Sequence, residues 1–302
     1  MPSLPAVQSS NASFTPSYLP VAVFLGGTSG IGRGTAEAFA RYTGGNAHII
    51  LIGRNASAAT SILSSFPKPT STESGWKHEF IECDVSLIKN VNATVASLLP
   101  RLPRVNFLVC SCGIFSFDDR KDTPEGLDIK LAVTYYARAV FMIKLLPALE
   151  AAAKAGQPAS VLNVLAAGHG STVELGNLGL KNGYTGMRSM HESVTYVDLL
   201  HVELSTKHPT VAFTHTYPGF IDTPIARIAA KLVPSWDINK AGNITDAGEV
   251  SLYALLTAAR GKAHMKGETS DDAEKPPVYG YGSSEESRAM LEHTEEVMNS
   301  NV

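Results

Sequence analysis

The chain has 302 residues, of which 44% are hydrophobic and 18% are charged. This composition is ordinary for a globular protein with a large core, and an α/β fold of this length commonly forms one domain. The formal net charge of -3 gives no positive field that would attract DNA or RNA, so no nucleic-acid partner is expected. No apolar run approaches the roughly 20 residues that a membrane helix needs, so no membrane span is expected.

The N-terminal segment, residues 1–19, is rich in Ser, Pro and Asn. It lacks the basic start and apolar core of a secretory signal. We therefore expect a flexible tail over residues 1–19, a single domain over residues 20–302 and a cytoplasmic location. The cysteines Cys83, Cys110 and Cys112 end apolar runs, where free thiols usually pack as small hydrophobic groups. Neither a disulfide framework nor a metal site is predicted.

Short β-rich runs alternate with longer helical patterns after residue 20. This alternation is typical of βαβ units and predicts a parallel sheet. The expected fold class is α/β, a single Rossmann-type doubly wound parallel sheet of about seven strands flanked by helices. Continuous apolar runs such as residues 107–110 support this fold class, because the strands of a sheet covered on both faces are apolar throughout. The strands are expected over residues 21–25, 48–52, 78–83, 105–111, 160–165, 210–217 and 278–281.

Helical patterns fill the stretches between these strands. The main helices are expected over residues 31–42, 124–153, 190–205 and 246–259, the last with Thr245 as its N-cap. The polar and charged segment 261–275 is interpreted as a surface loop before the last strand. A short amphipathic helix is expected near residues 285–298.

A glycine-rich turn, residues 26–32, follows the first strand directly and opens a helix. Glycines let the turn bend tightly and let the backbone approach a pyrophosphate, whose charge is stabilised by amide N–H groups and by the positive end of the helix. The spacing is wider than the GxGxxG of classical Rossmann enzymes. The residues of the turn expected to hold a dinucleotide are Gly26, Thr28, Ser29, Gly30, Ile31 and Gly32.

This turn resembles the TGxxxGxG turn of the short-chain dehydrogenase/reductase family, with Leu25 where the family usually has Thr. Three later segments extend the resemblance over roughly residues 20 to 260. The branch that the chain resembles is the retinol-dehydrogenase-like one, whose members carry an extra Tyr upstream of the catalytic Tyr. The three segments match an Asp that contacts the adenine, an Asn-Ala-Gly motif beside the adenine ribose, and a PGxxxT segment at the nicotinamide end. The matching residues are Asp84, Val85, Ser111, Cys112, Gly113, Pro218, Gly219 and Thr223.

The end of the second strand bears on which dinucleotide is bound. NAD-preferring members of the family typically carry an acidic residue here, and this chain has Arg54 followed by Asn55. A guanidinium can pair with a 2'-phosphate in a charge-assisted, fork-like geometry. The expected cofactor is therefore NADP(H).

The resemblance also implies four catalytic positions. The family uses a Tyr as proton donor or acceptor, a Lys that lowers the pKa of that Tyr, a Ser that orients the carbonyl oxygen, and an Asn in a proton relay. A tyrosine needs cationic help to act as a base at neutral pH. The Ser position is Ala166 and the Asn position is Thr134, so both of these groups are altered.

Two registers compete for the Tyr and Lys positions. In the first, Tyr184 is the acid/base and Arg188 replaces the Lys. In the second, Met190 and Val194 occupy the two positions, and the catalytic groups of the family are absent. His191 is then the best substitute for a proton-transferring group. Two further polar residues, His169 and Ser171, follow the fifth strand in a loop expected to border the substrate pocket.

Residues 224–240 correspond to the variable substrate-covering region of the family. Their apolar content predicts a small hydrophobic substrate. The leading hypothesis is an NADP(H)-dependent reductase or dehydrogenase acting on a hydrophobic carbonyl or alcohol. The alternatives are non-redox chemistry, such as cyclisation or isomerisation, and dinucleotide binding without catalysis. Because many members of the family assemble through two long helices, a homo-oligomer is expected.

Overall fold

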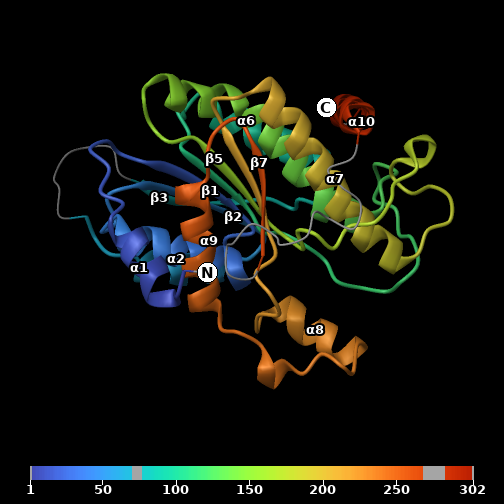
Figure 1. Ribbon diagram of the computed structural model, residues 1–302, viewed down its shortest axis with the longest axis horizontal. Coiled ribbons are helices and arrows are strands. Elements are labelled where there is room, and N and C mark those ends of the chain that lie inside the picture. Colours follow the sequence, from blue (N-terminus) through green and yellow to red (C-terminus); the bar gives the residue numbers. More distant parts are fainter. Residues whose placement is uncertain (1, 70–76, 268–282, 301–302) are drawn as a thin grey trace.

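A computed structural model describes residues 2–69, 77–267 and 283–300 (Figure 1). These residues contain one sheet of seven parallel strands in the order β3-β2-β1-β4-β5-β6-β7, which confirms the predicted fold class. The strands are β1 (Val21–Leu25), β2 (His48–Gly53), β3 (Lys77–Glu82), β4 (Phe107–Cys110), β5 (Ser160–Val164), β6 (Ala212–Thr216) and β7 (Ala263–Lys266).

Helices cover both faces of the sheet. Successive residues of β1 alternate between two cores, with Val23 facing α4, α6 and α7, and Phe24 facing α2, α3 and α9. Figure 1 shows α6 and α7 on one side of the sheet and α1, α2 and α9 on the other. The helices are α1 (Leu4–Ala12), α2 (Gly30–Tyr42), α3 (Ala56–Ser65), α4 (Ile88–Leu98), α5 (Ile129–Leu131), α6 (Ala137–Lys154), α7 (Gly186–Lys207), α8 (Pro224–Leu232), α9 (Ile244–Thr257) and α10 (Ser284–Ser300).

The strand order reverses between β1 and β4. The chain builds the sheet from β1 through β2 to β3, then returns to the other side of β1 and continues to β7. In an open α/β sheet, ligands bind beyond the carboxyl ends of the strands at such a switch point. The fold therefore places a binding crevice where β1 and β4 end.

The seventh strand departs from the prediction. It is formed by residues 263–266, inside the segment 261–275 that was interpreted as a loop, and this interpretation is wrong for those four residues. Its sequence, Ala-His-Met-Lys, carries no apolar run because β7 is a short edge strand in which only Met265 is buried. The strand expected over residues 278–281 lies outside the described residues.

The N-terminal segment is also different from the prediction. Residues 4–12 form α1, which packs against α9, so the expectation of a flexible tail is wrong for this part. Asn11 is buried, and its amide nitrogen donates hydrogen bonds to the Glu249 carboxylate (2.8 Å) and to the Glu249 carbonyl oxygen (3.0 Å). The sequence of this helix has no apolar stripe that would predict it. Hydrogen bonds from Asn11 to a residue far along the chain help to hold the helix in place.

Three helix boundaries differ from expectation. The helix predicted from residue 124 begins at Ile129 and includes a π-helical turn over Ala132–Tyr136 before α6. The N-cap of α9 is Asn243, whose side chain accepts a hydrogen bond from the Asp246 amide at 2.8 Å, and not Thr245. Helix α7 starts at Gly186, one turn before the predicted start. None of the helices that the structure describes combines the length and apolar character needed to cross a lipid bilayer.

Helix α10 confirms the predicted C-terminal helix and packs against α7. It is tied to the π-helical turn by hydrogen bonds from Tyr135 to Thr294 (2.6 Å) and from Tyr136 to His293 (2.7 Å). The two long helices through which a homo-oligomer was expected, α6 and α7, are thus partly covered by the chain itself. Assembly through α6 and α7 has to use the surface that α10 leaves free.

Glu79, on β3, sits in a cluster of cationic partners at the edge of the sheet. Its carboxylate contacts His48 Nε2 (2.9 Å), Lys77 Nζ (2.9 Å) and Arg101 Nη1 (3.1 Å), and its side chain is 14% exposed. Burial alone would raise the pKa of Glu79, but the hydrogen bonds from these three partners outweigh burial and lower the pKa from 4.5 to about 2. Because the folded-state pKa is depressed, the ionised carboxylate stabilises the fold above pH 4.5, and this contribution is lost as the pH falls towards 2.

The Glu79→Gln variant is expected to have a lower Tm than the natural protein at neutral pH. The Tm difference should shrink between pH 4.5 and about 2, where the natural carboxylate is itself protonated. Thermal unfolding followed by circular dichroism over this range checks the prediction. Glu82→Gln, in the same strand but exposed, is the control and should show no such pH dependence. A constant Tm difference for Glu79→Gln would contradict the stated role of its partners.

Candidate active site

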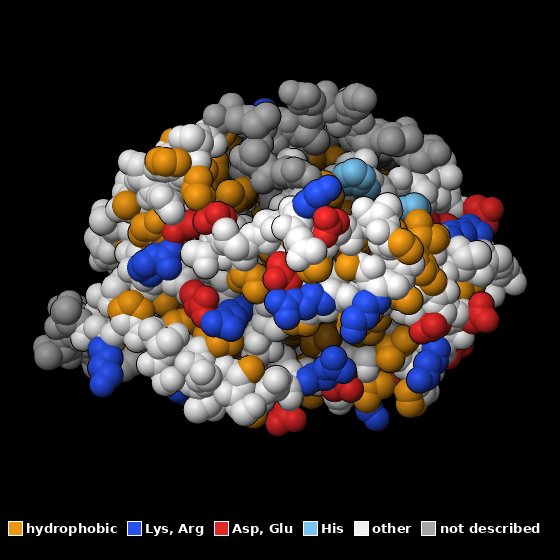
Figure 2. Space-filling model, turned by 90° about the horizontal axis from the view of Figure 1, so that it is seen from below, with side chains coloured by type: hydrophobic (Ala, Val, Ile, Leu, Met, Phe, Trp, Pro, Cys, Tyr) orange, Lys and Arg blue, Asp and Glu red, His pale blue; other side chains and the backbone are white. Residues whose placement is uncertain are grey.

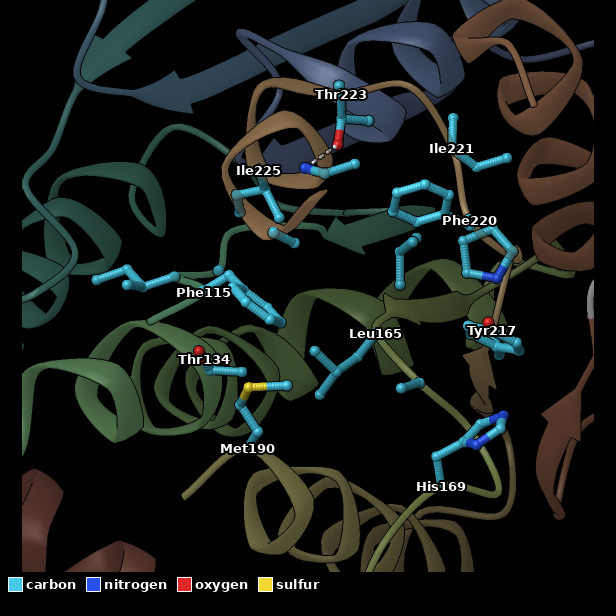
Figure 3. Close-up of a pocket in the computed structure, with 18 of the residues that line it drawn as sticks. Phe115, Thr134, Leu165, His169, Met190, Tyr217, Phe220, Ile221, Thr223 and Ile225 are labelled. Carbon is cyan, nitrogen blue, oxygen red and sulfur yellow. Dashed lines mark hydrogen bonds between the residues drawn. The ribbon is translucent and has the colours of Figure 1, made fainter. Parts of the chain in front are cut away.

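A cavity of about 970 Å³ lies beyond the carboxyl ends of β1, β4, β5 and β6 (Figure 3). One end is formed by the glycine turn between β1 and α2, and the other by α7, α8 and the loop after β4. On the face that Figure 2 shows, Lys and Arg side chains are interspersed with acidic and hydrophobic ones, and no broad surface of one charge forms.

The glycine turn has the geometry that a phosphate needs. Gly26 (φ 87°) and Gly30 (φ 54°) adopt left-handed backbone conformations, and a Cβ on Gly26 would lie 2.6 Å from the Cys112 nitrogen. Ser29, the N-cap of α2, makes no side-chain capping hydrogen bond. The Gly32 amide donates to the Ser111 hydroxyl (3.1 Å), which leaves the Gly30 and Ile31 amides for an anion in the cavity that Ser29, Gly30 and Ile31 line. These features fit a dinucleotide pyrophosphate.

A second recess adjoins the first at Ser29 and Pro224 and contains Arg54, the residue predicted to bind the 2'-phosphate. Arg54 is exposed here and forms no ion pair with another described residue. The lining residues are uncharged apart from Arg54, so no acidic side chain in the recess would repel a phosphate. They are Thr28, Ser29, Arg54, Asn55, Ala56, Ser57 and Pro224.

The other predicted cofactor residues fall into two groups. Those that line the cavity are Ser111, Gly113, Pro218, Gly219 and Thr223, and those that do not are Gly26, Gly32, Asp84, Val85 and Cys112. The glycines of the second group shape the turn, and the Val85 side chain packs in the core. The Asp84 carboxylate accepts hydrogen bonds from the Ser86 amide (3.0 Å) and hydroxyl (2.8 Å). The Cys112 thiol is directed to the Val133 carbonyl (3.2 Å) and not to the cavity.

The positions of the second register meet in the cavity. Met190 and Val194, one turn apart on α7, line it together with Thr134 and Ala166. Figure 3 shows Met190 and Thr134 on the same side of the cavity, below Phe115. Apart from the Thr134 hydroxyl, these four side chains offer no polar group to a substrate.

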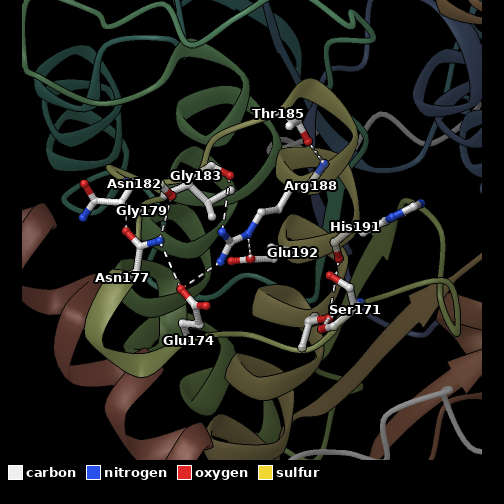
Figure 4. Close-up of polar contacts among 12 residues, drawn as sticks. Ser171, Glu174, Asn177, Gly179, Asn182, Gly183, Thr185, Arg188, His191 and Glu192 are labelled. Carbon is white, nitrogen blue, oxygen red and sulfur yellow. Dashed lines mark hydrogen bonds and ion pairs between the residues drawn. The ribbon is translucent and has the colours of Figure 1, made fainter.

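The structure does not bring Tyr184 and Arg188, predicted in the first register as an acid/base pair, to the cavity wall. The Tyr184 ring packs under the Lys130 ammonium, 5.2 Å from the ring centre, and burial raises the pKa of Tyr184, the opposite of what a base requires. Arg188 is bound to the carboxylates of Glu192 (2.6 Å) and Glu174 (3.1 Å), as Figure 4 shows. Neither residue is among those lining the cavity in the described chain, because α7 begins at Gly186 and turns Arg188 to its outer side.

The histidines differ in their surroundings. His191 lines the cavity, which a substitute proton-transferring group would have to do. Its side chain has no hydrogen-bond partner among the described residues. His169 also lines it and packs edge-on against Tyr217, with ring centres 4.5 Å apart. Ser171 does not reach the cavity, because its backbone nitrogen and oxygen are held by the Thr195 hydroxyl (2.9 and 2.6 Å). The loop after β5 therefore borders the cavity through His169.

Two buried cations of the cavity wall were not predicted. Lys130 donates hydrogen bonds to the carbonyl oxygens of Ser116 (3.3 Å) and Asp118 (2.6 Å) and so holds the loop after β4. Arg138, which is 1% exposed, donates to backbone carbonyls at the ends of β4 and β5. The signal in the sequence is a charged residue inside an otherwise apolar helical stretch. That signal indicates a buried charge but not the groups that it contacts.

The opposite end of the cavity is aromatic and aliphatic. Phe115 packs against Phe117 and Trp236 (ring centres 5.2 and 5.6 Å apart), and Trp236 against Phe220 (5.4 Å). Helix α8, the predicted substrate cover, adds Ile225, whose side chain points into the cavity in Figure 3. Among the described residues, no group of three or more His, Cys, Asp or Glu side chains is arranged to hold a metal ion.

Solved structures share this fold. The RhlG/NADP active-site complex of Pseudomonas aeruginosa matches with a TM-score of 0.61 at 17% identity, over 86% of this chain and 98% of that chain. The 3-ketoacyl-(acyl-carrier-protein) reductase of Brucella melitensis, complexed with NADH, matches with a TM-score of 0.58 at 19% identity, over 82% and 96%.

Sequence comparison identifies the family. The chain is 36% identical over 269 residues to an oxidoreductase of Emericella nidulans, which covers 85% of this chain and 78% of that protein. It is 25% identical over 256 residues to the polyprenol dehydrogenase of Homo sapiens, over 81% and 74%. The family model described as short chain dehydrogenase matches residues 20–231. The chain belongs to the short-chain dehydrogenase family and is an oxidoreductase.

Proposed function

We propose that this protein is an NADP(H)-dependent reductase or dehydrogenase that acts on a hydrophobic carbonyl or alcohol. The observation that carries the proposal is the continuity of the cavity, which joins the free helix N-terminus at the glycine turn to an aromatic and aliphatic end. One end suits a dinucleotide and the other an apolar substrate. Residues of α7, the end of β5 and the segments that follow β4 and β6 line the middle, where the two would meet.

The preference for NADP(H) is proposed from Arg54. It lies in a recess with Thr28 and Ser57, which add hydroxyl donors, and no carboxylate lines that recess. A guanidinium gives a phosphate charge-assisted hydrogen bonds that the ribose hydroxyl of NAD(H) does not replace.

Substitution of Arg54 by Gln is expected to weaken NADPH binding by about 10- to 100-fold, the range for losing hydrogen bonds between charged groups. NADH affinity should stay within about twofold. Titration with each dinucleotide, followed by calorimetry, measures both constants. Arg33→Gln is the matched control, because it removes the same charge near the start of α2 from a residue outside both recesses. Equal losses of NADPH and NADH in Arg54→Gln would exclude a 2'-phosphate contact.

The hydrophobic substrate is proposed from the cavity wall. Phe115, Phe220, Ile225 and Trp236 surround the end away from the glycine turn, and apolar walls favour ligands that bury apolar surface. The human relative is named as the dehydrogenase of a polyprenol, an alcohol with a hydrocarbon chain, which agrees with this assignment. A substrate screen that starts from apolar ketones would identify the carbonyl or alcohol that the protein converts.

The catalytic centre is proposed to be non-standard. Thr134, Ala166, Met190 and Val194 stand together in the cavity, whereas the family uses Asn, Ser, Tyr and Lys. When bound, the reduced dinucleotide supplies a hydride to the carbonyl carbon. The protein then has to hold the substrate carbonyl in the middle of the cavity and to provide a proton for its oxygen from another residue, of which His191 is one candidate.

A cytoplasmic location is proposed from the thiols. Cys83, Cys110 and Cys112 are all free, as expected for a protein of a reducing compartment.

A homo-oligomer is also proposed, with an interface restricted to surfaces that α10 does not cover. Light scattering of the purified protein tests this proposal.

A further inference from the structure

The cavity has few groups that can transfer a proton. Its serine and threonine hydroxyls are poor acids near neutral pH, and histidine is the side chain that ordinarily changes charge between about pH 5 and 8. The titratable and charged side chains lining the cavity are Lys130, Arg138, His169, His191, Tyr217, Asp237 and Lys240.

Most of these groups have other roles. Lys130 and Arg138 are buried and bound to backbone carbonyls, as described above. Asp237 accepts a hydrogen bond from the Asn239 amide (3.0 Å) and is 3.9 Å from Lys240, and both of these charged residues are exposed at the rim. His169, Tyr217 and His191 remain as groups that a substrate in the middle of the cavity can reach.

His169 and Tyr217 come from neighbouring strands. His169 follows β5, three residues after Ala166, and Tyr217 directly follows β6, immediately before the predicted cofactor residues Pro218 and Gly219. Because β5 and β6 are adjacent in the sheet, the two rings meet, with centres 4.5 Å apart and planes inclined by 63°. Figure 3 shows them together at one side of the cavity. His169 is exposed, and its ring contacts that of Tyr217, next to the cofactor end of the site.

We propose that His169 is the catalytic acid/base of this enzyme and that Tyr217 is its positioning residue. The inference rests on the proposed function, and it assigns the proton that the altered positions at Met190 and Val194 no longer supply. In reduction, the hydride forms a C–H bond at the carbonyl carbon, the C=O π bond breaks, and the dinucleotide is oxidised. The His169 imidazolium donates one ring proton to the oxygen, and the neutral imidazole regains a proton from water. Alcohol oxidation follows the reverse sequence.

His191 is the competing candidate. It follows Met190 on α7, but no aromatic or hydrogen-bonding partner fixes its ring within the described chain. Its substitution therefore serves as the matched control, because it removes the same chemical group from another wall of the same cavity.

The test compares His169→Gln, His191→Gln, Tyr217→Leu and Tyr217→Phe with the natural protein, using NADPH and benzil, an apolar diketone. His169→Gln should reduce the rate of benzil-dependent NADPH oxidation by about 100-fold, the usual contribution of a general acid. The natural rate should fall as the pH rises and the imidazolium loses its proton, and this fall should be absent in His169→Gln. Tyr217→Leu, which removes the ring, should lower the rate, and Tyr217→Phe, which keeps the ring that contacts His169, should recover most of it. His191→Gln should lower the rate less than His169→Gln does, and the fall with rising pH should persist in it. An unchanged rate and profile in His169→Gln would overturn the proposal.

A second measurement does not depend on turnover. Imidazole NMR signals of the NADP⁺ complex are assigned by their absence in His169→Gln and His191→Gln, and benzil is then added. The His169 signals should shift, and they should shift less in Tyr217→Leu, which lacks the ring that contacts His169. If benzil is bound and leaves the His169 signals unmoved, or is not bound at all, the assignment of His169 to the carbonyl site is wrong. Failure of NADPH to bind in the preceding titration would instead refute the proposed function.

Discussion

Replacement of Gly34 by Val is expected to reduce the free energy of unfolding by about 3 kcal/mol, the upper part of the range for overpacking. Helices α2 and α9 cross with their backbones in contact at this residue. A Cβ on Gly34 would lie 2.4 Å from the Ile244 carbonyl oxygen, and a Cβ on Gly248 would lie 2.4 Å from the Gly34 carbonyl carbon. Both obstacles are backbone atoms, so the helices must separate to admit a side chain.

The separation of α2 and α9 should also weaken NADPH binding. The N-terminus of α2 carries the glycine turn, and moving the helix displaces the amide groups proposed to hold the pyrophosphate. Urea unfolding and an NADPH titration of Gly34→Val measure the two effects. Gly176→Val is the control, because an added Cβ there meets no atom within 4 Å. Equal stability of the two variants would show that α2 and α9 tolerate a wider spacing.

The fold was largely predictable because its strands are signalled locally. β1, β2 and β4 are mainly apolar runs, and two buried faces leave such runs little alternative to a parallel sheet. β7 was missed because an edge strand of four residues needs no apolar run. Helix α1 was missed because its anchor is Asn11 against Glu249, a pair of polar residues 238 positions apart.

The two halves of the site were predictable to different degrees. The glycine turn requires particular residues at fixed spacing, and the structure places Ser29, Gly30 and Ile31 at the cavity as expected. The catalytic half depends on which residues of α7 face the cavity. Counting alone allows either Tyr184 with Arg188 or Met190 with Val194, and the choice follows only from where α7 begins and which side it turns to the sheet.

The contact between His169 and Tyr217 could not be predicted from the sequence, although both residues could be identified in it. Both residues are visible in the sequence as polar groups after adjacent strands, and His169 was expected to border the pocket. Their distance of 4.5 Å, however, depends on the conformation of the loop after β5, where Gly168 adopts a positive φ of 83°. Composition and spacing do not determine such a loop.

Substitution of Arg138 by Met is expected to reduce the free energy of unfolding by about 3 kcal/mol, because buried acceptors lose their donors. The guanidinium donates to the carbonyl oxygens of Cys110 (3.2 Å), Cys112 (3.2 Å from Nε) and Val164 (3.0 Å), and to Asn163 Oδ1 (3.3 Å). Methionine fills a similar volume but donates no hydrogen bond. Arg138→Lys keeps the charge with fewer donors, so its stability should be intermediate.

Loss of these bonds should also weaken NADPH binding, since the carbonyls belong to the ends of β4 and β5, where Ser111 and Ala166 enter the cavity. Urea unfolding and calorimetric titration of the variant measure stability and affinity separately. Lys144→Met, on the same helix but outside the cavity, is the control and should change both by little. If Arg138→Met is as stable as Lys144→Met, the strand ends are held by the sheet alone, and the buried arginine has to be explained by contact with the ligand. Natural stability combined with lost NADPH affinity would support that explanation directly.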